Sequence, residues 1–178
     1  DLAREQGLIQ KFNPLPSYFD HLRTLIRTDL IAENPQRFVV DSMHGSGRGV
    51  IKSFLQGTGC DITEIRGEMN PGFGGVHPEP IRQYLGALAG AIGAGMGNYG
   101  IATDGDADRI GAMDERSVFV DPHKIMSLAL RYLVEKRGLT GSVVRTVSTT
   151  RMIDRLAKKY GLTLHETPVG FNHIADYM

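Results

Sequence analysis

The sequence predicts an α/β protein made of layered α/β/α domains with mixed, largely parallel sheets, one domain complete and a second, similar one partial. Short apolar runs typical of buried strands alternate with amphipathic segments of helical period. This alternation restarts after residue 121. A hydrophobic fraction of 41% is ordinary for a chain that buries a core. We therefore expect a connector at residues 1–16, one domain at 17–118 and part of another at 119–178.

The first domain is expected to open with a helix after the connector. Apolar side chains recur on one face of this helix at Phe19, Leu22, Leu25 and Ile26. A glycine-rich turn at 44–49 is expected to join the first strand to the next helix. The expected strands are 37–41, 61–66 and 99–103, followed by a hairpin of 110–113 and 118–120. The other expected helices are 50–56 and one that begins at His77-Pro78-Glu79-Pro80, with Ile81, Leu85 and Leu88 on its inner face.

The second domain is expected to begin with a helix that Asp121 caps and that has Pro122 at its first position. Apolar residues then recur at helical spacing, namely Ile125, Leu128, Ala129, Tyr132 and Leu133. Gly161 is expected to end a later helix. The remaining expected elements are strands at 142–147 and 162–166, a helix at 151–160 and a helix from Val169 onward.

Composition excludes several classes of function. Lys+Arg and Asp+Glu both number 20, so the formal net charge is zero, and neither nucleic acid nor an anionic membrane is indicated as a partner. The only cysteine, Cys60, cannot form an intrachain disulfide, which favours the cytoplasm. No apolar run approaches the ~20 residues of a membrane helix. The first residue is not Met, and we interpret the chain as an excerpt of a longer protein; no feature indicates an oligomeric state.

The strongest chemical signal is the acidic loop Thr103-Asp104-Gly105-Asp106-Ala107-Asp108-Arg109. On an extended backbone, residues at alternate positions project to the same side, so the three carboxylates would converge. Like charges held together are costly unless a cation joins them. Carboxylate oxygens are hard ligands, so Mg²⁺ is expected, with Ca²⁺ and Mn²⁺ as competitors. The simple alternative is a solvated acidic turn.

A calcium-binding EF-hand is a second alternative for this loop. Its ligand pattern also begins Asp-x-Asp-x-Asp, and Glu115 falls at the twelfth position. The sixth position, however, requires glycine for a sharp turn and here holds Arg109. The residues before the loop also favour a strand rather than the helix of an EF-hand. A magnesium site at a strand end is therefore preferred.

The acidic loop resembles the magnesium loop of the α-D-phosphohexomutases, the family of phosphoglucomutase and phosphomannomutase. Further segments resemble the same family and follow its order over about residues 13–178. These segments are Val39-Val40-Asp41 with the glycine-rich turn, Asn70-Pro71 with His77-Pro78-Glu79-Pro80, and Thr167-Pro168-Val169-Gly170-Phe171. Family members have four domains. The resemblance implies that this chain holds the second domain and the first part of the third.

The resemblance also implies a reaction. The family transfers a phosphoryl group between O1 and O6 of a hexose phosphate through a phosphoserine and a bisphosphorylated sugar. Asp104, Asp106 and Asp108 match its magnesium ligands, and a phosphoserine oxygen is the fourth ligand. Arg109 matches the arginine that follows them, and its planar fork suits phosphate oxygens. A structural ion pair with the loop is an equal alternative for Arg109.

Departures from the family limit what the chain alone can do. The phosphoserine belongs to a first domain that this chain lacks, so we expect the chain alone to be inactive; Ser46 is expected to be a turn residue. Asn172 stands where the family often has lysine, and no phosphate contact is assigned there. Glucose, mannose and glucosamine phosphates all stay open as substrates, with glucose favoured by overall similarity only. A non-catalytic module that binds a divalent cation is the alternative function.

Other candidate residues are interpreted as structural. The turn at 45–49 could suggest a dinucleotide loop, but its glycines lack the Gly-x-Gly-x-x-Gly spacing, so close packing of a strand and a helix is favoured. His77 is expected to be structural beside Pro78. The remaining candidates form no metal-ligand spacing, namely His44, His123, His165 and His173.

Overall fold

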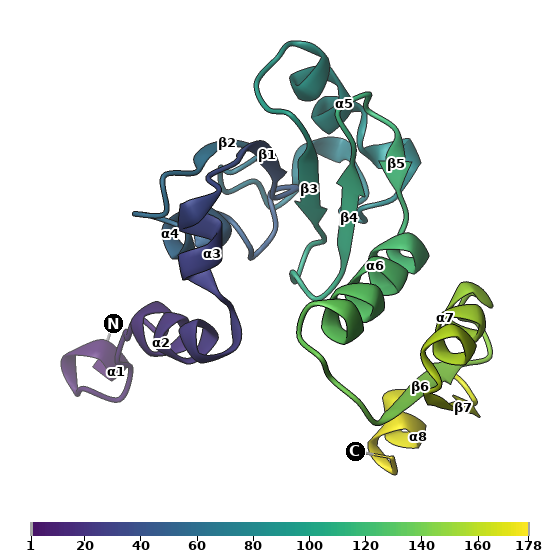
Figure 1. Cartoon of the computed structure of the whole chain (residues 1–178). Coiled ribbons are helices and arrows are strands. Elements are labelled where there is room, and N and C mark those ends of the chain that lie inside the picture. Colours follow the sequence, from purple (N-terminus) through teal and green to yellow (C-terminus); the bar gives the residue numbers. More distant parts are fainter. Residues whose placement is uncertain (1, 178) are drawn as a thin grey trace. The chain divides into compact units, whose positions relative to one another are not determined.

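The computed structural model describes residues 2–177, and the chain divides into two compact units, residues 1–119 and 120–178 (Figure 1). Both units contain strands flanked by helices, as the sequence predicts. No helix in the described part of the chain is long and apolar enough to cross a membrane.

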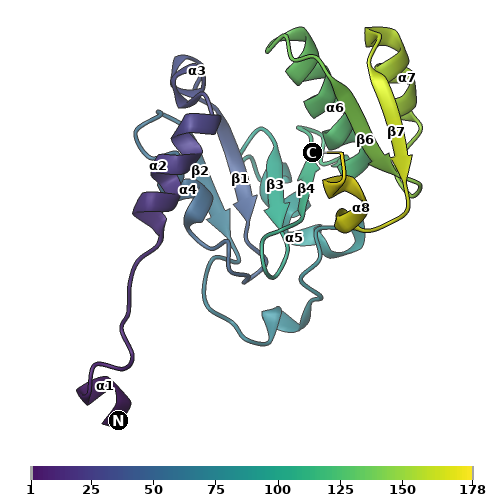
Figure 2. The same ribbon diagram turned by 90° about the horizontal axis from the view of Figure 1, so that it is seen from below.

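A five-stranded sheet forms the centre of the first unit. Its spatial order is β2-β1-β3-β4-β5. Figure 2 shows β2, β1, β3 and β4 side by side in this order. The pairs β1–β2 and β1–β3 are parallel, whereas β3–β4 is antiparallel. The strands are β1 Arg37–Asp41, β2 Asp61–Ile65, β3 Gly100–Thr103, β4 Ile110–Met113 and β5 Phe119–Val120. This sheet confirms the predicted α/β class with a mixed, largely parallel sheet.

Helices cover both faces of this sheet because the side chains of β1 alternate between them. Val39 points into a core cluster with Leu85, Leu88 and Ile92 of the α5 side, while Phe38 and Val40 belong to a second cluster that includes Ile51 and Leu55 of the α4 side. The helices of this unit are α1 Leu2–Glu5, α2 Leu15–Leu25, α3 Thr28–Glu33, α4 Val50–Phe54 and α5 Gly86–Gly93, with 3₁₀ turns η1 Phe73–Gly75 and η2 Arg82–Tyr84.

Residues 1–16, expected to be a connector, contain the short helix α1 and the start of α2. The structure corrects one local prediction. The helix expected from His77 is interrupted, because the backbone of Ile81 is extended and α5 begins only at Gly86. Prolines at 78 and 80 explain the interruption, since proline disfavours helical backbone in the residue before it. Leu85 and Leu88 are nevertheless fully buried, as expected.

The second unit contains a parallel pair of strands with helices beside it. Asp121 caps α6 by accepting a hydrogen bond at Oδ1 from the Lys124 N–H at 3.0 Å, and Pro122 follows it. Gly161 ends α7 with a φ of 66°, the left-handed conformation that glycine adopts at little cost. The elements are α6 Pro122–Glu135, β6 Ser142–Thr146, α7 Met152–Tyr160, β7 Thr163–Thr167 and α8 Phe171–Ala175.

A buried arginine ties the second unit together. The Arg145 guanidinium, only 4% exposed, contacts both carboxylate oxygens of Asp154 at 2.7 Å and Glu166 Oε2 at 2.6 Å. The hydrogen bonds from Arg145 hold the pKa of Asp154 below its usual value of 3.8. Because a buried guanidinium is costly without anionic partners, α7 and β7 are both fixed to β6 by this residue.

We predict that Asp154→Asn lowers the thermal unfolding midpoint by several degrees at pH 7. A carboxylate whose pKa is lowered by folding stabilises the protein above its unfolded pKa, so the difference from wild type should shrink as the pH falls below about 3.8. Circular dichroism melts across pH 2.5–7 measure this difference. Glu166→Gln is the control. Because the Glu166 carboxylate is 53% exposed, its loss should lower the unfolding midpoint less than the loss of the Asp154 carboxylate. Equal effects of the two substitutions would contradict the conclusion that Asp154 is the more important partner of Arg145.

Candidate metal centre

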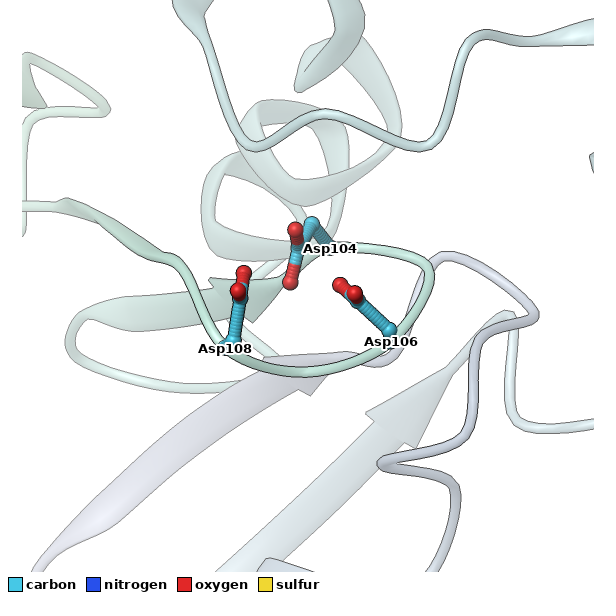
Figure 3. A group of neighbouring side chains, drawn as sticks. All are labelled: Asp104, Asp106 and Asp108. Atoms are coloured by element: carbon cyan, nitrogen blue, oxygen red, sulfur yellow. The ribbon is translucent and has the colours of Figure 1, made fainter. Parts of the chain in front are cut away.

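The acidic loop connects β3 to β4 and brings its three carboxylates together. One oxygen from each of Asp104, Asp106 and Asp108 can be chosen so that all lie within 4.8 Å of one another. Figure 3 shows the three side chains directed toward the inside of the loop. The side chain of Asp104 is fully buried and the other two are exposed. Three hard oxygen donors facing one point fit a divalent cation such as Mg²⁺.

The backbone geometry of the loop differs from the extended form that the alternation suggested. Residues 105–107 form bends, and Ala107 has a left-handed φ of 65°. The loop curls back because Asp104 O accepts the Ala107 N–H at 3.3 Å and Arg109 O accepts the Asp104 N–H at 3.3 Å. The carboxylates therefore converge because the chain turns around them.

Two neighbouring segments hold this curled loop in place. Gly105 O accepts the Ser46 N–H at 2.9 Å, and the Gly105 N–H donates to Pro78 O at 3.1 Å. Ser46 is thus placed as a turn residue beside the acidic loop. A Cβ atom at Gly45 would lie only 2.5 Å from Asp104 O and 2.8 Å from Gly105 O. The glycine-rich turn is therefore needed for close packing against the acidic loop.

A buried ion pair fixes the start of the glycine-rich turn. Asp41, at the end of β1, is fully buried and is paired with Arg66, whose Nε donates to Asp41 Oδ1 at 2.8 Å while Nη2 contacts Oδ2. Asp41 Oδ1 also accepts the Met43 N–H at 3.1 Å. Met43 and His44 then adopt positive φ values of 43° and 58°. The turn is held in this unusual backbone by the ion pair beneath it.

Arg109 is bound to the loop and to a segment outside it. Its backbone N–H donates to Asp104 Oδ1 at 3.0 Å and its Nε donates to Asp104 Oδ2 at 2.7 Å. Its Nη1 donates to Glu79 Oε1 at 2.9 Å. The structural ion pair, one of the two alternatives for Arg109, is therefore present, and it leaves the phosphate-binding role of Arg109 untested. Sequence reasoning missed Glu79, although the motif His77-Pro78-Glu79-Pro80 contained it, because contact between residues 79 and 109 depends on the fold.

The electrostatics of the three carboxylates differ. Burial opposes ionisation of Asp104, but hydrogen bonds from the backbone and side chain of Arg109 outweigh it and hold the pKa of Asp104 below 3.8. The negative charge of Asp106, followed by burial and the charge of Asp104, raises the pKa of Asp108. Repulsion between the exposed carboxylates is thus not fully offset by Arg109, and a bound cation would relieve it.

The other sequence candidates lie outside this group of carboxylates. Glu115 follows β4 and is not one of the grouped acidic residues, so the EF-hand arrangement is absent from the described loop. His77 stacks on Tyr84 with ring centroids 5.6 Å apart, and His44 is buried with Nδ1 3.3 Å from Glu68 O. Asn172 lies in α8 of the second unit.

The fold and the loop define an α/β/α domain with an acidic loop at the end of a central strand. The family description "Phosphoglucomutase/phosphomannomutase, alpha/beta/alpha domain II" matches residues 16–117, and domain III of the same family matches residues 121–178. The chain belongs to the phosphoglucomutase/phosphomannomutase family.

Individual relatives agree with this membership. The chain is 26% identical over 166 residues to a phosphoglucomutase/phosphomannomutase of Thermococcus kodakarensis, covering 93% of this chain and 36% of the relative. It is 31% identical to a phosphoglucosamine mutase of Methanocaldococcus jannaschii, covering 79% and 32%. The crystal structure of a candidate phosphomannomutase from Thermus thermophilus superposes with a TM-score of 0.86 at 33% identity, covering 93% and 38%. The chain thus spans about one third of the length of these relatives.

We predict that Gly45→Ala destabilises the first unit by about 1–3 kcal/mol, the range for overpacked sites. The added methyl group would press on the backbone carbonyl of Asp104, which accepts the Ala107 N–H within the curled loop. Urea unfolding followed by circular dichroism measures the change. Gly90→Ala is the matched control. Gly90 lies within α5, and apart from its chain neighbours and the backbone of its own helix no described atom would lie within 4 Å of the added Cβ, so the substitution should stabilise by about 0.5–1 kcal/mol. Equal effects of the two variants would refute the packing argument.

Proposed function

We propose that this chain supplies the metal-binding loop of a phosphohexomutase that moves a phosphoryl group between O1 and O6 of a hexose phosphate, through a phosphoserine and a bisphosphorylated sugar. The observation that carries the proposal is the convergence of three carboxylates at the end of β3 in a domain of this family. Asp104, Asp106 and Asp108 would hold Mg²⁺. Bound there, Mg²⁺ would offset the negative charge of the phosphoryl group during transfer.

The three ligands would contribute differently. Asp104 is buried and accepts hydrogen bonds from Arg109 at both oxygens, so its carboxylate is oriented before any cation arrives. Asp106 and Asp108 are exposed and can adjust to the cation. The side chain of Arg109 is 56% exposed, and we assign it a supporting role in stabilising charge on phosphate oxygens.

The rest of the active site is proposed to lie in other parts of a longer protein. The chain covers only about one third of the length of these relatives, and the phosphoserine and the sugar-selecting groups would come from the parts that it does not cover. We therefore propose that the chain alone is inactive. The names of these relatives refer to phosphates of glucose, mannose or glucosamine. All three sugars are therefore candidate substrates of the complete protein. The cytoplasm is the proposed compartment.

We predict that Asp106→Asn in the complete protein lowers turnover of a hexose 1-phosphate by more than about 100-fold. Changes to the partners of metal ligands already cost about 10–100-fold, and a ligand should cost more. A coupled assay of hexose 6-phosphate formation at saturating Mg²⁺ measures the loss. Glu115→Gln is the control, since it removes one exposed negative charge beyond the far end of β4, outside the carboxylate group, and should keep wild-type turnover. Wild-type turnover by Asp106→Asn would refute the metal assignment.

A second prediction separates the enzyme from a non-catalytic cation-binding module. The complete protein, purified and analysed by intact mass and phosphate release, should carry phosphate on a serine, as the phosphoserine mechanism requires. Treatment with a hexose bisphosphate should raise the phosphorylated fraction. Magnesium binding without any phosphoserine would contradict the mutase and support the non-catalytic module.

A further inference from the structure

The segment His77-Pro78-Glu79-Pro80 forms a support along the outside of the acidic loop. Pro78 O accepts the Gly105 N–H at 3.1 Å. A Cβ atom at Gly105 would lie 3.3 Å from Pro78 Cγ, and one at Gly111 would collide with Pro80 O. The segment is therefore packed against the loop at Gly105 and against β4, the strand that follows the loop, at Gly111. Its backbone is fixed by hydrogen bonds from the Glu79 N–H to His77 O and from the Ile81 N–H to Glu79 O, both at 2.8 Å.

Glu79 extends from this support to the arginine of the loop. Its Oε1 accepts the Arg109 Nη1–H at 2.9 Å, and its side chain is 31% exposed. His77 Nδ1 lies 3.9 Å from Glu79 Oε2, which is too far for a strong hydrogen bond. Arg109 is therefore the principal described partner of the Glu79 carboxylate.

The guanidinium of Arg109 is shared between two carboxylates at different atoms. Nε donates a hydrogen bond to Asp104 and Nη1 donates one to Glu79, while Asp108 Oδ1 lies 3.7 Å from Nε. Because a guanidinium is a rigid planar fork, anchoring Nη1 at Glu79 fixes the plane of the whole group. Arg109 already donates to both oxygens of Asp104. Without Glu79, Nη1 would lose its partner, and the fork could rotate to place a donor on Asp108, where it would compete with a cation for the same oxygen.

We infer that Glu79 is a positioning residue that acts through Arg109: it keeps the guanidinium on Asp104 and away from Asp108, and so leaves the Asp108 carboxylate available to a divalent cation. The inference rests on the proposed metal function of the loop. It assigns Glu79 no contact with the cation itself. It predicts that the Glu79 charge affects cation affinity only while Arg109 is present.

The test is a double-mutant cycle on the complete protein, with Mg²⁺ affinity measured by calorimetry. Glu79→Gln should raise the Mg²⁺ dissociation constant by about 3- to 10-fold. This effect is larger than expected for loss of an exposed ion pair, and no larger than the smallest loss of metal affinity expected when a direct partner of a metal ligand is changed. In an Arg109→Gln background, Glu79→Gln should change the Mg²⁺ dissociation constant by less than about 1.5-fold, because the guanidinium that Glu79 positions is absent. Glu115→Gln supplies the matched loss of one exposed negative charge and should have no effect.

A metal-free measurement tests the positioning directly. In protein labelled with ¹⁵N-arginine, NMR should show slow rotation about the Arg109 Cζ–Nη1 bond, and Glu79→Gln should accelerate it at an unchanged unfolding temperature. Unchanged rotation, or an equal loss of Mg²⁺ affinity in both backgrounds, would overturn the inference and leave the metal site standing. If the wild-type protein bound no Mg²⁺ at all, the proposed function would fail, and the role given to Glu79 with it.

Discussion

The buried carboxylate of Asp104 is the constraint on which the loop depends. A negative charge that is fully removed from water is costly unless it is paired and hydrogen-bonded. Arg109 supplies both, with one bond from its backbone and one from its side chain. These two bonds link Asp104, near the start of the acidic loop, to Arg109 at its end, so the same contacts satisfy the buried charge and close the loop. The convergence of the other two carboxylates follows from that closure.

The closed loop in turn imposes requirements on residues far away in the sequence. Gly45 must lack a side chain so that the turn after β1 can approach Asp104 O, and Pro78 O must face the Gly105 N–H. The turn after β1 is held by the buried pair of Asp41 and Arg66. Because β1 and β3 are adjacent parallel strands, their carboxyl-terminal ends meet at one edge of the sheet. The topology therefore brings the glycine-rich turn and the acidic loop together.

Much of the fold could be predicted because strands and capped helices have local signals. The apolar run of β1, the Asp121-Pro122 helix start and the Gly161 helix end all follow from nearest neighbours in sequence. The path of the acidic loop could not be predicted in the same way. Alternating aspartates suggested an extended backbone, whereas hydrogen bonds between residues 104, 107 and 109 curl it and give Ala107 a positive φ. The contact of Glu79 with Arg109 spans 30 residues and exists only once the sheet has formed.

The unequal burial of the three carboxylates bears on the kind of site this loop can form. A cage of buried, mutually fixed ligands would hold a cation for stability alone. Here one carboxylate is preoriented and two face solvent, so a cation bound by the three would keep open positions on the exposed side. Magnesium in phosphoryl-transfer sites is typically held by few carboxylates, with phosphate oxygens and water completing its octahedron. The asymmetry of the loop therefore favours a cation that meets a phosphate ligand over one that serves only to stabilise the fold.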